Sequence, residues 1–291
     1  MSFSNKQIRN QLKKAEPRYF MKRRFRISGP AIPFILMITI APSVSVAGEC
    51  PTPASTIATD RPDVTNSSVV VPLGSLQIEN GVNTTGRGYE KSFDGTNSRL
   101  RLGVGPCLEV LIDLPNYFGA LRGQTESGFS NVVPAIKWQL SSLPEPWNLS
   151  ITSGIGLPTG AVKISGHGVQ PYLQFPWSHE LGDGWGTSGM VTTFFFPNNP
   201  LNKLTTEATL VLERKVTERA SLFVEYVGDY PSRGSRVELI NIGGSYLLTR
   251  THQIDIHAAF GINRNSPDYI VGVGYSFRFD HLFDDLSRRR N

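Results

Sequence analysis

The sequence predicts an all-β protein, an antiparallel up-and-down transmembrane β-barrel of about twelve strands. Three observations predict it. After residue 48, apolar and polar residues alternate with period two, and no stretch keeps apolar residues at helical spacing for three turns. Most predicted strands span about 9 to 13 residues, enough for a tilted strand to cross a bilayer. The connections between them alternate between tight turns and longer polar loops.

The basic charge of the chain is confined to its first 47 residues. The whole sequence holds 29 Lys and Arg against 24 Asp and Glu, a net charge of +5. Nine of the basic residues and one acidic residue fall within 1–47, which leaves 48–291 with 20 basic and 23 acidic residues. The overall positive charge would suggest nucleic-acid binding, but residues 48–291 are net negative, and this argues against that function.

Residues 1–47 are predicted to be a basic leader and signal peptide. Four basic residues within 22–26 precede the apolar run AIPFILMITIA (31–41), and SVA (45–47) fits a cleavage site. A membrane-spanning helix needs about 20 apolar residues, so the alternative of an uncleaved anchor is less favoured. Met21 directly precedes the basic cluster, which makes 1–20 a candidate misassigned start. The remainder divides into an N-terminal segment at 48–73, a barrel at 74–280 and a polar tail at 281–291.

The alternation predicts the strands one by one. It is clearest in the last, where Tyr269, Val271, Val273 and Tyr275 interleave with small or polar residues. The predicted strands lie at 75–86, 97–105, 107–115, 129–141, 148–157, 168–179, 184–196, 204–214, 220–229, 236–248, 252–263 and 268–280.

The connections predict which end of the barrel is which. The tight set lies at 106–107, 142–147, 181–184, 215–219 and 249–251. The longer, more polar set lies at 87–96, 116–128, 158–166, 197–203, 230–235 and 263–267. This asymmetry is typical of an outer-membrane barrel with periplasmic turns and external loops, and an even strand count places both termini on the short-turn side. The predicted location is therefore the outer membrane of a Gram-negative cell.

A soluble β-sandwich or a large soluble barrel is the alternative fold. There the apolar face would point inward, whereas in a membrane barrel it meets lipid. Aromatic residues near strand ends, from Phe118 and Phe129 to Tyr269 and Phe279, favour interfacial girdles and hence the membrane barrel. The last strand, ending at Phe279, also resembles the closing-strand signal read by the barrel assembly machinery.

Several segments resemble one known family. They are TDRPD (59–63), VPLGSLQIENG (71–81), GLPTG (156–160), LFVEY (222–226), GIN (261–263) with SPD (266–268), and VGVGYSFRF (271–279). In these the chain resembles the outer-membrane β-barrel family labelled "putative MetA-pathway of phenol degradation", often described as transporters. The likeness covers about residues 58–280, with GFSN (128–131) departing from the family's usual Gly-x-Gly-Asp. It implies a barrel at the outer membrane and says little about the solute.

The polar face of the strands supplies the candidate functional residues. If the apolar face meets lipid, the lumen and its constriction are lined by Glu79, Arg99, Arg101, Glu109, Asp113, Lys137, Glu207, Glu213, Glu225, Asp255, His257 and Arg278. Opposed charges in a narrow lumen select ions or polar solutes. The same residues would also suit a salt-bridged core that closes the barrel. A barrel of about twelve strands is intermediate in size between barrels filled by side chains and barrels with an open channel.

The N-terminal segment leaves two alternatives open. Asp60, Arg61 and Asp63 form a compact charged group that either folds into the lumen as a plug or lies solvated in the periplasm. Cys50 and Cys107 both fall on the predicted periplasmic side, where a disulfide between them is feasible. Their spacing does not suit a metal site.

The pattern favours a non-enzyme without a metal or other cofactor. His257 points inward by phase and has no Ser in register, and no Gly-x-Ser-x-Gly, paired-His or phosphate-loop motif is present. We expect passive passage or binding of small solutes, including aromatic ones, through a narrow charged lumen. A closed structural or surface-interaction barrel is the first alternative, and a lipid-modifying barrel enzyme is the second. The expected partners are outer-membrane lipid and the assembly machinery.

Overall fold

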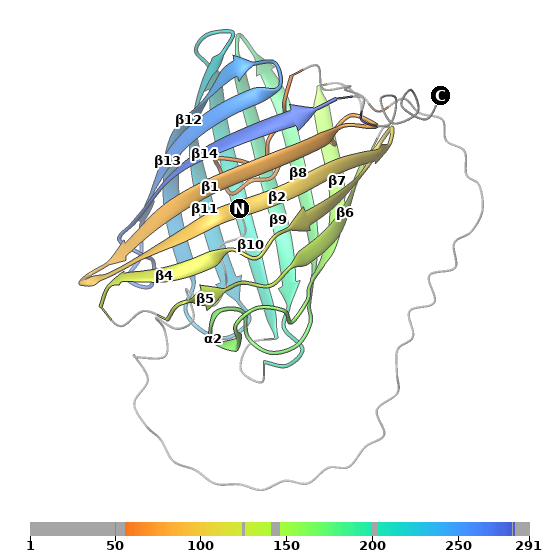
Figure 1. Ribbon diagram of the computed structural model, residues 1–291. Coiled ribbons are helices and arrows are strands. Elements are labelled where there is room, and N and C mark those ends of the chain that lie inside the picture. Colours follow the sequence, from red (N-terminus) through yellow and green to blue (C-terminus); the bar gives the residue numbers. More distant parts are fainter. Residues whose placement is uncertain are drawn as a thin grey trace, which may run out of the picture.

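The protein is a closed antiparallel β-barrel in a computed structural model (Figure 1). The structure describes residue 50, residues 56–123, 126–140, 146–199 and 203–280, and residue 282. The predicted leader at 1–47, with its candidate misassigned start at 1–20, and nearly all of the polar tail lie outside the described residues. No helix within the described ranges has the length and apolarity to cross a membrane.

Fourteen strand segments build the barrel. They are β1 (Leu76–Arg87), β2 (Glu90–Gly105), β3 (Leu108–Asp113), β4 (Tyr117–Arg122), β5 (Gly128–Phe129), β6 (Val133–Gln139), β7 (Trp147–Gly156), β8 (Gln170–Gly182), β9 (Trp185–Phe195), β10 (Leu204–Lys215), β11 (Ala220–Pro231), β12 (Val237–Thr249), β13 (His252–Gly261) and β14 (Tyr269–Phe279).

These segments form twelve barrel strands, which confirms the predicted fold. β3 and β4 pair with successive parts of β2, so these two segments together form one interrupted strand. β6 pairs with β3 and β5 pairs with β4, so β5 and β6 form a second interrupted strand. Every other neighbour in the sheet is also antiparallel, and β1 pairs with both β2 and β14. This last pairing closes the barrel.

Two predicted boundaries were wrong at the first hairpin. The expected long loop at 87–96 is a two-residue turn at Gly88 and Tyr89, and β2 starts at Glu90 rather than 97. The run Asp94–Asn97 has turn-type composition, but the pairing with β1 continues past it through a register shift between Glu79 and Gly81. The predicted loop at 116–128 likewise contains β4, which pairs with the newly found part of β2.

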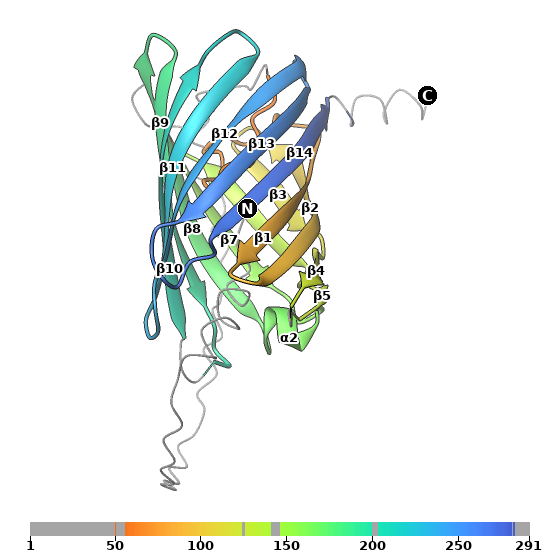
Figure 2. The same ribbon diagram turned by 90° about the vertical axis from the view of Figure 1, so that its left-hand side faces the viewer.

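The two ends of the barrel differ as expected in the remaining connections. The turns after β2, β8, β10 and β12 lie at one end, which we call the short-turn rim and which is uppermost in Figure 1. The connections after β7, β9, β11 and β13 lie at the other end, the long-loop rim, and the first of them holds the short helix α2 (Val162–Ser165). Figure 2 shows the same arrangement from the side.

The polar face of the strands points into the barrel and the apolar face points outward. Among the described residues, 34 buried side chains are polar or charged and 15 are hydrophobic, the reverse of a soluble core. Residues such as Leu210, Ile256 and Val273 are exposed on the outside. This rejects the soluble alternative and matches a lipid-facing belt. Phe118, expected at an interface, is buried instead because it pairs with Asp94 on the inward face of β2.

A lysine on the outward face should destabilise the barrel strongly at mid-height. Ile256 pairs with Val273 near the middle of β13 and β14 and is 58% exposed. We expect Ile256→Lys to lower the free energy of unfolding in bilayers by about 2–4 kcal/mol, because the ammonium would meet hydrocarbon. Ile262→Lys, just beyond β13 at the rim, should cost about 0–1 kcal/mol. Denaturant titration in lipid vesicles measures both, and equal losses would contradict a membrane-spanning belt.

Candidate functional site in the plugged lumen

Residues 56–73, which we call the plug segment, fold into the lumen. The segment, drawn in orange in Figures 1 and 2, runs inside the barrel wall. It enters at the short-turn rim, where the Ile57 N–H donates to the Arg250 carbonyl, and it returns there as Leu73 bridges to Gly103. In this structure the segment thus lies within the lumen. Sequence alternation gave no sign of this, because the segment forms no strand.

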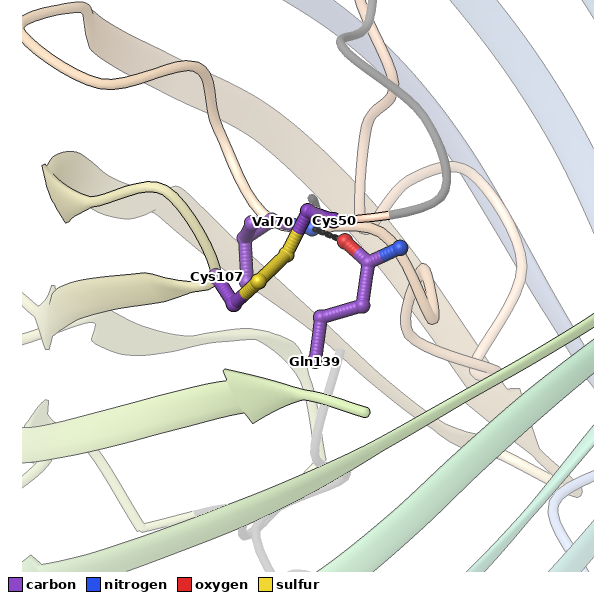
Figure 3. The surroundings of a disulfide bond; sticks show 4 residues. All are labelled: Cys50, Val70, Cys107 and Gln139. Atoms are coloured by element: carbon purple, nitrogen blue, oxygen red, sulfur yellow. Dashed lines mark hydrogen bonds between the residues drawn. A yellow bond between two sulfur atoms is a disulfide. The ribbon is translucent and has the colours of Figure 1, made fainter. Parts of the chain in front are cut away.

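A disulfide ties the chain before the plug segment to the barrel wall. Cys50 and Cys107 are bonded, with their Cα atoms 5.3 Å apart, and Cys107 lies in the turn between β2 and β3 (Figure 3). Beside it, the Val70 N–H donates to the Gln139 side-chain oxygen at 3.0 Å. The plug segment is thus fixed covalently at both ends, by the disulfide and by β1.

Three basic side chains of the wall converge in the lumen. Arg99 and Arg101 come from β2 and Lys137 from β6, and we call them the cation cluster. Strand β3 lies between them and contributes Glu109, which bonds Arg101 at 3.0 Å and Lys137 at 3.2 Å. Arg101, Glu109 and Lys137 are fully buried, and buried charges of this kind are stable only when each is paired. Arg99 in turn bonds Asp113 through two nitrogens.

The plug segment completes this charge network. Asp60 contacts all three members of the cation cluster at 2.8 to 3.2 Å. Its N–H donates to both oxygens of Glu79, which also pairs with Arg101 at 3.1 Å. Arg101 further donates to the carbonyls of Ala58 and Val69, one on each arm of the plug segment. One wall residue therefore holds both arms.

Glu225 binds the deepest turn of the plug segment. Its carboxylate accepts from the N–H groups of Val64 and Thr65 and from the Thr65 hydroxyl, all within 3.1 Å. Asn241 on β12 donates to the same carboxylate at 2.8 Å. This buried carboxylate has no basic partner, and backbone N–H groups of the plug segment supply its hydrogen bonds instead. Val64 itself packs into an apolar cluster of the lumen with Met190, Val227, Val237, Leu239, Ala259 and Ile270.

Arg61 of the plug segment pairs with Asp255 on β13, with two contacts of 3.1 and 3.3 Å. Its guanidinium lies against the backbone of the closing strands. A Cβ at Gly81 or Gly274 would come within 2.3 or 2.4 Å of it, so a side chain at either place would displace the arginine. The glycines at these inward positions make room for the plug segment.

His257 lies inside the wall without a catalytic partner. It is buried, and its two ring nitrogens face the side-chain oxygens of Asn241 and Asn83 at 3.1 and 3.2 Å. Neither neighbour is a nucleophile or a carboxylate. The geometry is that of a polar packing residue.

The remaining predicted lumen residues lie apart from the cation cluster. Glu207 is buried near the long-loop rim, directly across from Asp229 on β11. Arg278 bonds Asp280 and donates to the carbonyl of Thr56, where the plug segment enters. Glu213 is on the inward face of β10 but is exposed towards the short-turn rim, so the structure does not bring it into the network.

Three amides and two buried acids of the lumen were not among the predicted residues, which were all charged or titratable. Asn83, Asn97 and Asn116 all donate to the carboxylate of Asp94. Asp94 was missed because its half of β2 was taken for a loop. Asp229 was omitted although it follows Glu225 at the spacing of the inward face, and that spacing was the available signal.

The two acids of the plug segment experience opposite fields. Burial alone would raise the pKa of Asp60, but the cation cluster, led by Arg101, lowers it well below its usual value. Asp63 has no such partner. Burial, followed by the like charges of Glu225 and Glu213, raises its pKa well above the usual value. Negative charge is therefore favoured at one point of the plug segment and disfavoured three residues later.

Solved structures of outer-membrane porins share this architecture. A NanC porin superposes with a TM-score of 0.51 at 8% identity, covering 69% of this chain and 98% of that chain. A KdgM porin in complex with disordered oligogalacturonate gives 0.50 at 6% identity, covering 70% and 99%. At such identities the likeness shows the fold alone. No curated protein matches the sequence.

The family model described as "Putative MetA-pathway of phenol degradation" matches residues 59–279. The match begins within the plug segment and ends with the last residue of β14, so it includes the plug as well as the wall. The chain therefore belongs to this family and has the fold of an outer-membrane porin.

Proposed function

We propose that the protein is an outer-membrane channel that passes small solutes, including aromatic ones, by diffusion, and that its own plug segment controls the lumen. The observation that carries this proposal is that a separate segment fills the lumen. The wall side chains contribute charges and amides that contact that segment rather than one another across the barrel.

The strand number supports a lumen with room for a solute. Barrels of about eight strands are filled by their own side chains, whereas about sixteen leave an aqueous channel. Twelve strands fall between these limits, and here the plug segment occupies the lumen. Displacing that segment would expose a polar passage lined by the cation cluster and its carboxylates.

A closed structural barrel is the second candidate. It is favoured by the complete burial of Arg101, Glu109, Lys137 and Glu225, because none of these side chains is open to solvent in this arrangement. In that case the loops of the long-loop rim would carry the function.

The proposal includes export and assembly. The leader at 1–47 would direct export, and the outward face of β14, ending in Phe279, would present the closing strand to the barrel assembly machinery. Outer-membrane lipid is then the surrounding partner. We propose no catalytic role, since His257 contacts only amides.

Liposome swelling tests the proposal. Vesicles holding the full-length protein are compared with vesicles holding a variant in which residues 58–70 are replaced by a Gly-Ser linker, using sugars, amino acids and aromatic acids of graded size. Heat-modifiable gel migration verifies that both barrels are folded. Swelling of the full-length protein with at least one solute supports the channel.

Swelling of the linker variant alone would favour the closed barrel as the native state. Absence of swelling in both folded proteins with every solute would refute passage through this lumen.

A further inference from the structure

Asp60 occupies a site built for a carboxylate. Its Oδ1 accepts from Lys137 at 3.2 Å and from the N–H of Ser67 at 2.9 Å, and it forms an ion pair with Arg101 at 3.2 Å. Its Oδ2 accepts from Arg99 at 2.8 Å. The carboxylate is 1% exposed. Three hydrogen-bond donors, two of them charged, and the charge of Arg101 thus converge on one carboxylate group.

The wall supplies the charged donors and the plug segment supplies the anion. Arg99, Arg101 and Lys137 project from β2 and β6, whereas Asp60 belongs to a segment outside the sheet. Without Asp60, the three cations would keep their wall carboxylates and their bonds to other oxygens of the plug segment. Arg99 and Lys137 would each lose one acceptor and Arg101 one ion-pair partner, and leaving buried donors unsatisfied is costly.

The site favours a negative charge even with the wall carboxylates present. The lowered pKa of Asp60 includes the penalty of burial, and the attraction of the cation cluster exceeds it. Asp60 is also held locally by single hydrogen bonds rather than by strand pairing, through its own N–H to Glu79 and through Ser67. A free carboxylate therefore competes with one tethered group.

We propose that the cation cluster is the binding site for the carboxylate group of a small organic acid, and that Asp60 fills it as an internal substitute for that ligand. The inference rests on the proposed function, because a solute reaches these residues only through the lumen. It assigns carboxylic acids as the solute class and explains why the plug segment carries an acid at this position.

Chemical rescue of Asp60→Ala in the full-length protein tests the site. We expect the variant to show a lowered thermal transition, and acetate at concentrations above the millimolar range should raise that transition towards the wild-type value. Acetamide, which matches acetate in shape without its charge, should leave it unchanged. If the variant folds poorly, the yield of heat-modifiable barrel after refolding in acetate or acetamide gives the same comparison.

Matched variants separate the site from a general salt effect. Asp63→Ala changes an acid of the same segment that does not contact the cation cluster, and acetate should not shift its transition. Asp60→Ala combined with Lys137→Met should lose the acetate response. Equal responses to acetate and acetamide, or a full acetate response in the double variant, would overturn the proposal.

Bilayer recordings connect the site to passage. In Asp60→Ala channels, benzoate should reduce the chloride current in a concentration-dependent manner, and benzyl alcohol should not. If no variant conducts, the channel function fails while acetate rescue still reports on the site. If the variants conduct but neither benzoate block nor acetate rescue occurs, the carboxylate site alone is refuted.

Discussion

Replacing Arg101 with methionine should lower the free energy of unfolding by about 3–5 kcal/mol, because it leaves buried carboxylates without their charge partner. Arg101 is fully buried and pairs with Asp60, Glu79 and Glu109 at 3.0 to 3.2 Å. Methionine fills most of the volume but supplies no donor. The plug segment would also lose two carbonyl contacts, so the variant should conduct more than the wild type.

Arg236→Met is the matched control for this prediction. Arg236 also pairs with a glutamate, Glu238 at 3.3 Å, but its side chain is 65% exposed. An exposed pair of this kind contributes about 0–1 kcal/mol. Denaturant titrations in vesicles measure both variants, and bilayer recordings measure conductance. A similar small loss in the two variants would show that Arg101 does not anchor the charge network.

Removing the disulfide should have the next largest effect. Cys50 and Cys107 are separated by 57 positions, and the chain-entropy model gives about 4 kcal/mol for closing a loop of that length. The double variant Cys50→Ser/Cys107→Ser should therefore be less stable. The loop contains the whole plug segment, whose only remaining covalent attachment to the wall would be β1. Swelling of vesicles should therefore also become faster.

A reductant provides the control for the disulfide. Dithiothreitol should reproduce both changes in the wild type and leave the double serine variant unaffected. Thiol alkylation followed by mass measurement verifies that the bond has been reduced. Unchanged swelling and stability in a wild-type sample shown to be fully reduced would mean that the disulfide does not restrain the plug segment.

The strands, and the division of each into a polar and an apolar face, could be predicted because alternation is a local property of the sequence. The same rule failed at Asp94–Asn97, where turn-type residues continue a strand through a register shift, and Asn97 adopts a positive φ of 46°. Alternation also cannot say which face is inward. That depends on whether the surroundings are lipid or water.

The plug segment could not be predicted from periodicity, because its N–H groups pair with side chains of distant strands. Charge balance held a partial signal. The predicted inward residues include seven acids but only four Lys or Arg, so some carboxylates had to find other donors. Glu225 finds them in the N–H groups of Val64 and Thr65. A surplus of inward acids thus points to a polypeptide segment inside the lumen.

The seam between β1 and β14 bears on the order of assembly. Both cysteines precede β3, so the cross-link that restrains the plug segment involves only the first part of the chain. The seam, by contrast, needs the last strand of all. A growing barrel can therefore carry its plug segment bound to the first hairpin before the wall is complete, so the lumen is filled as it is enclosed.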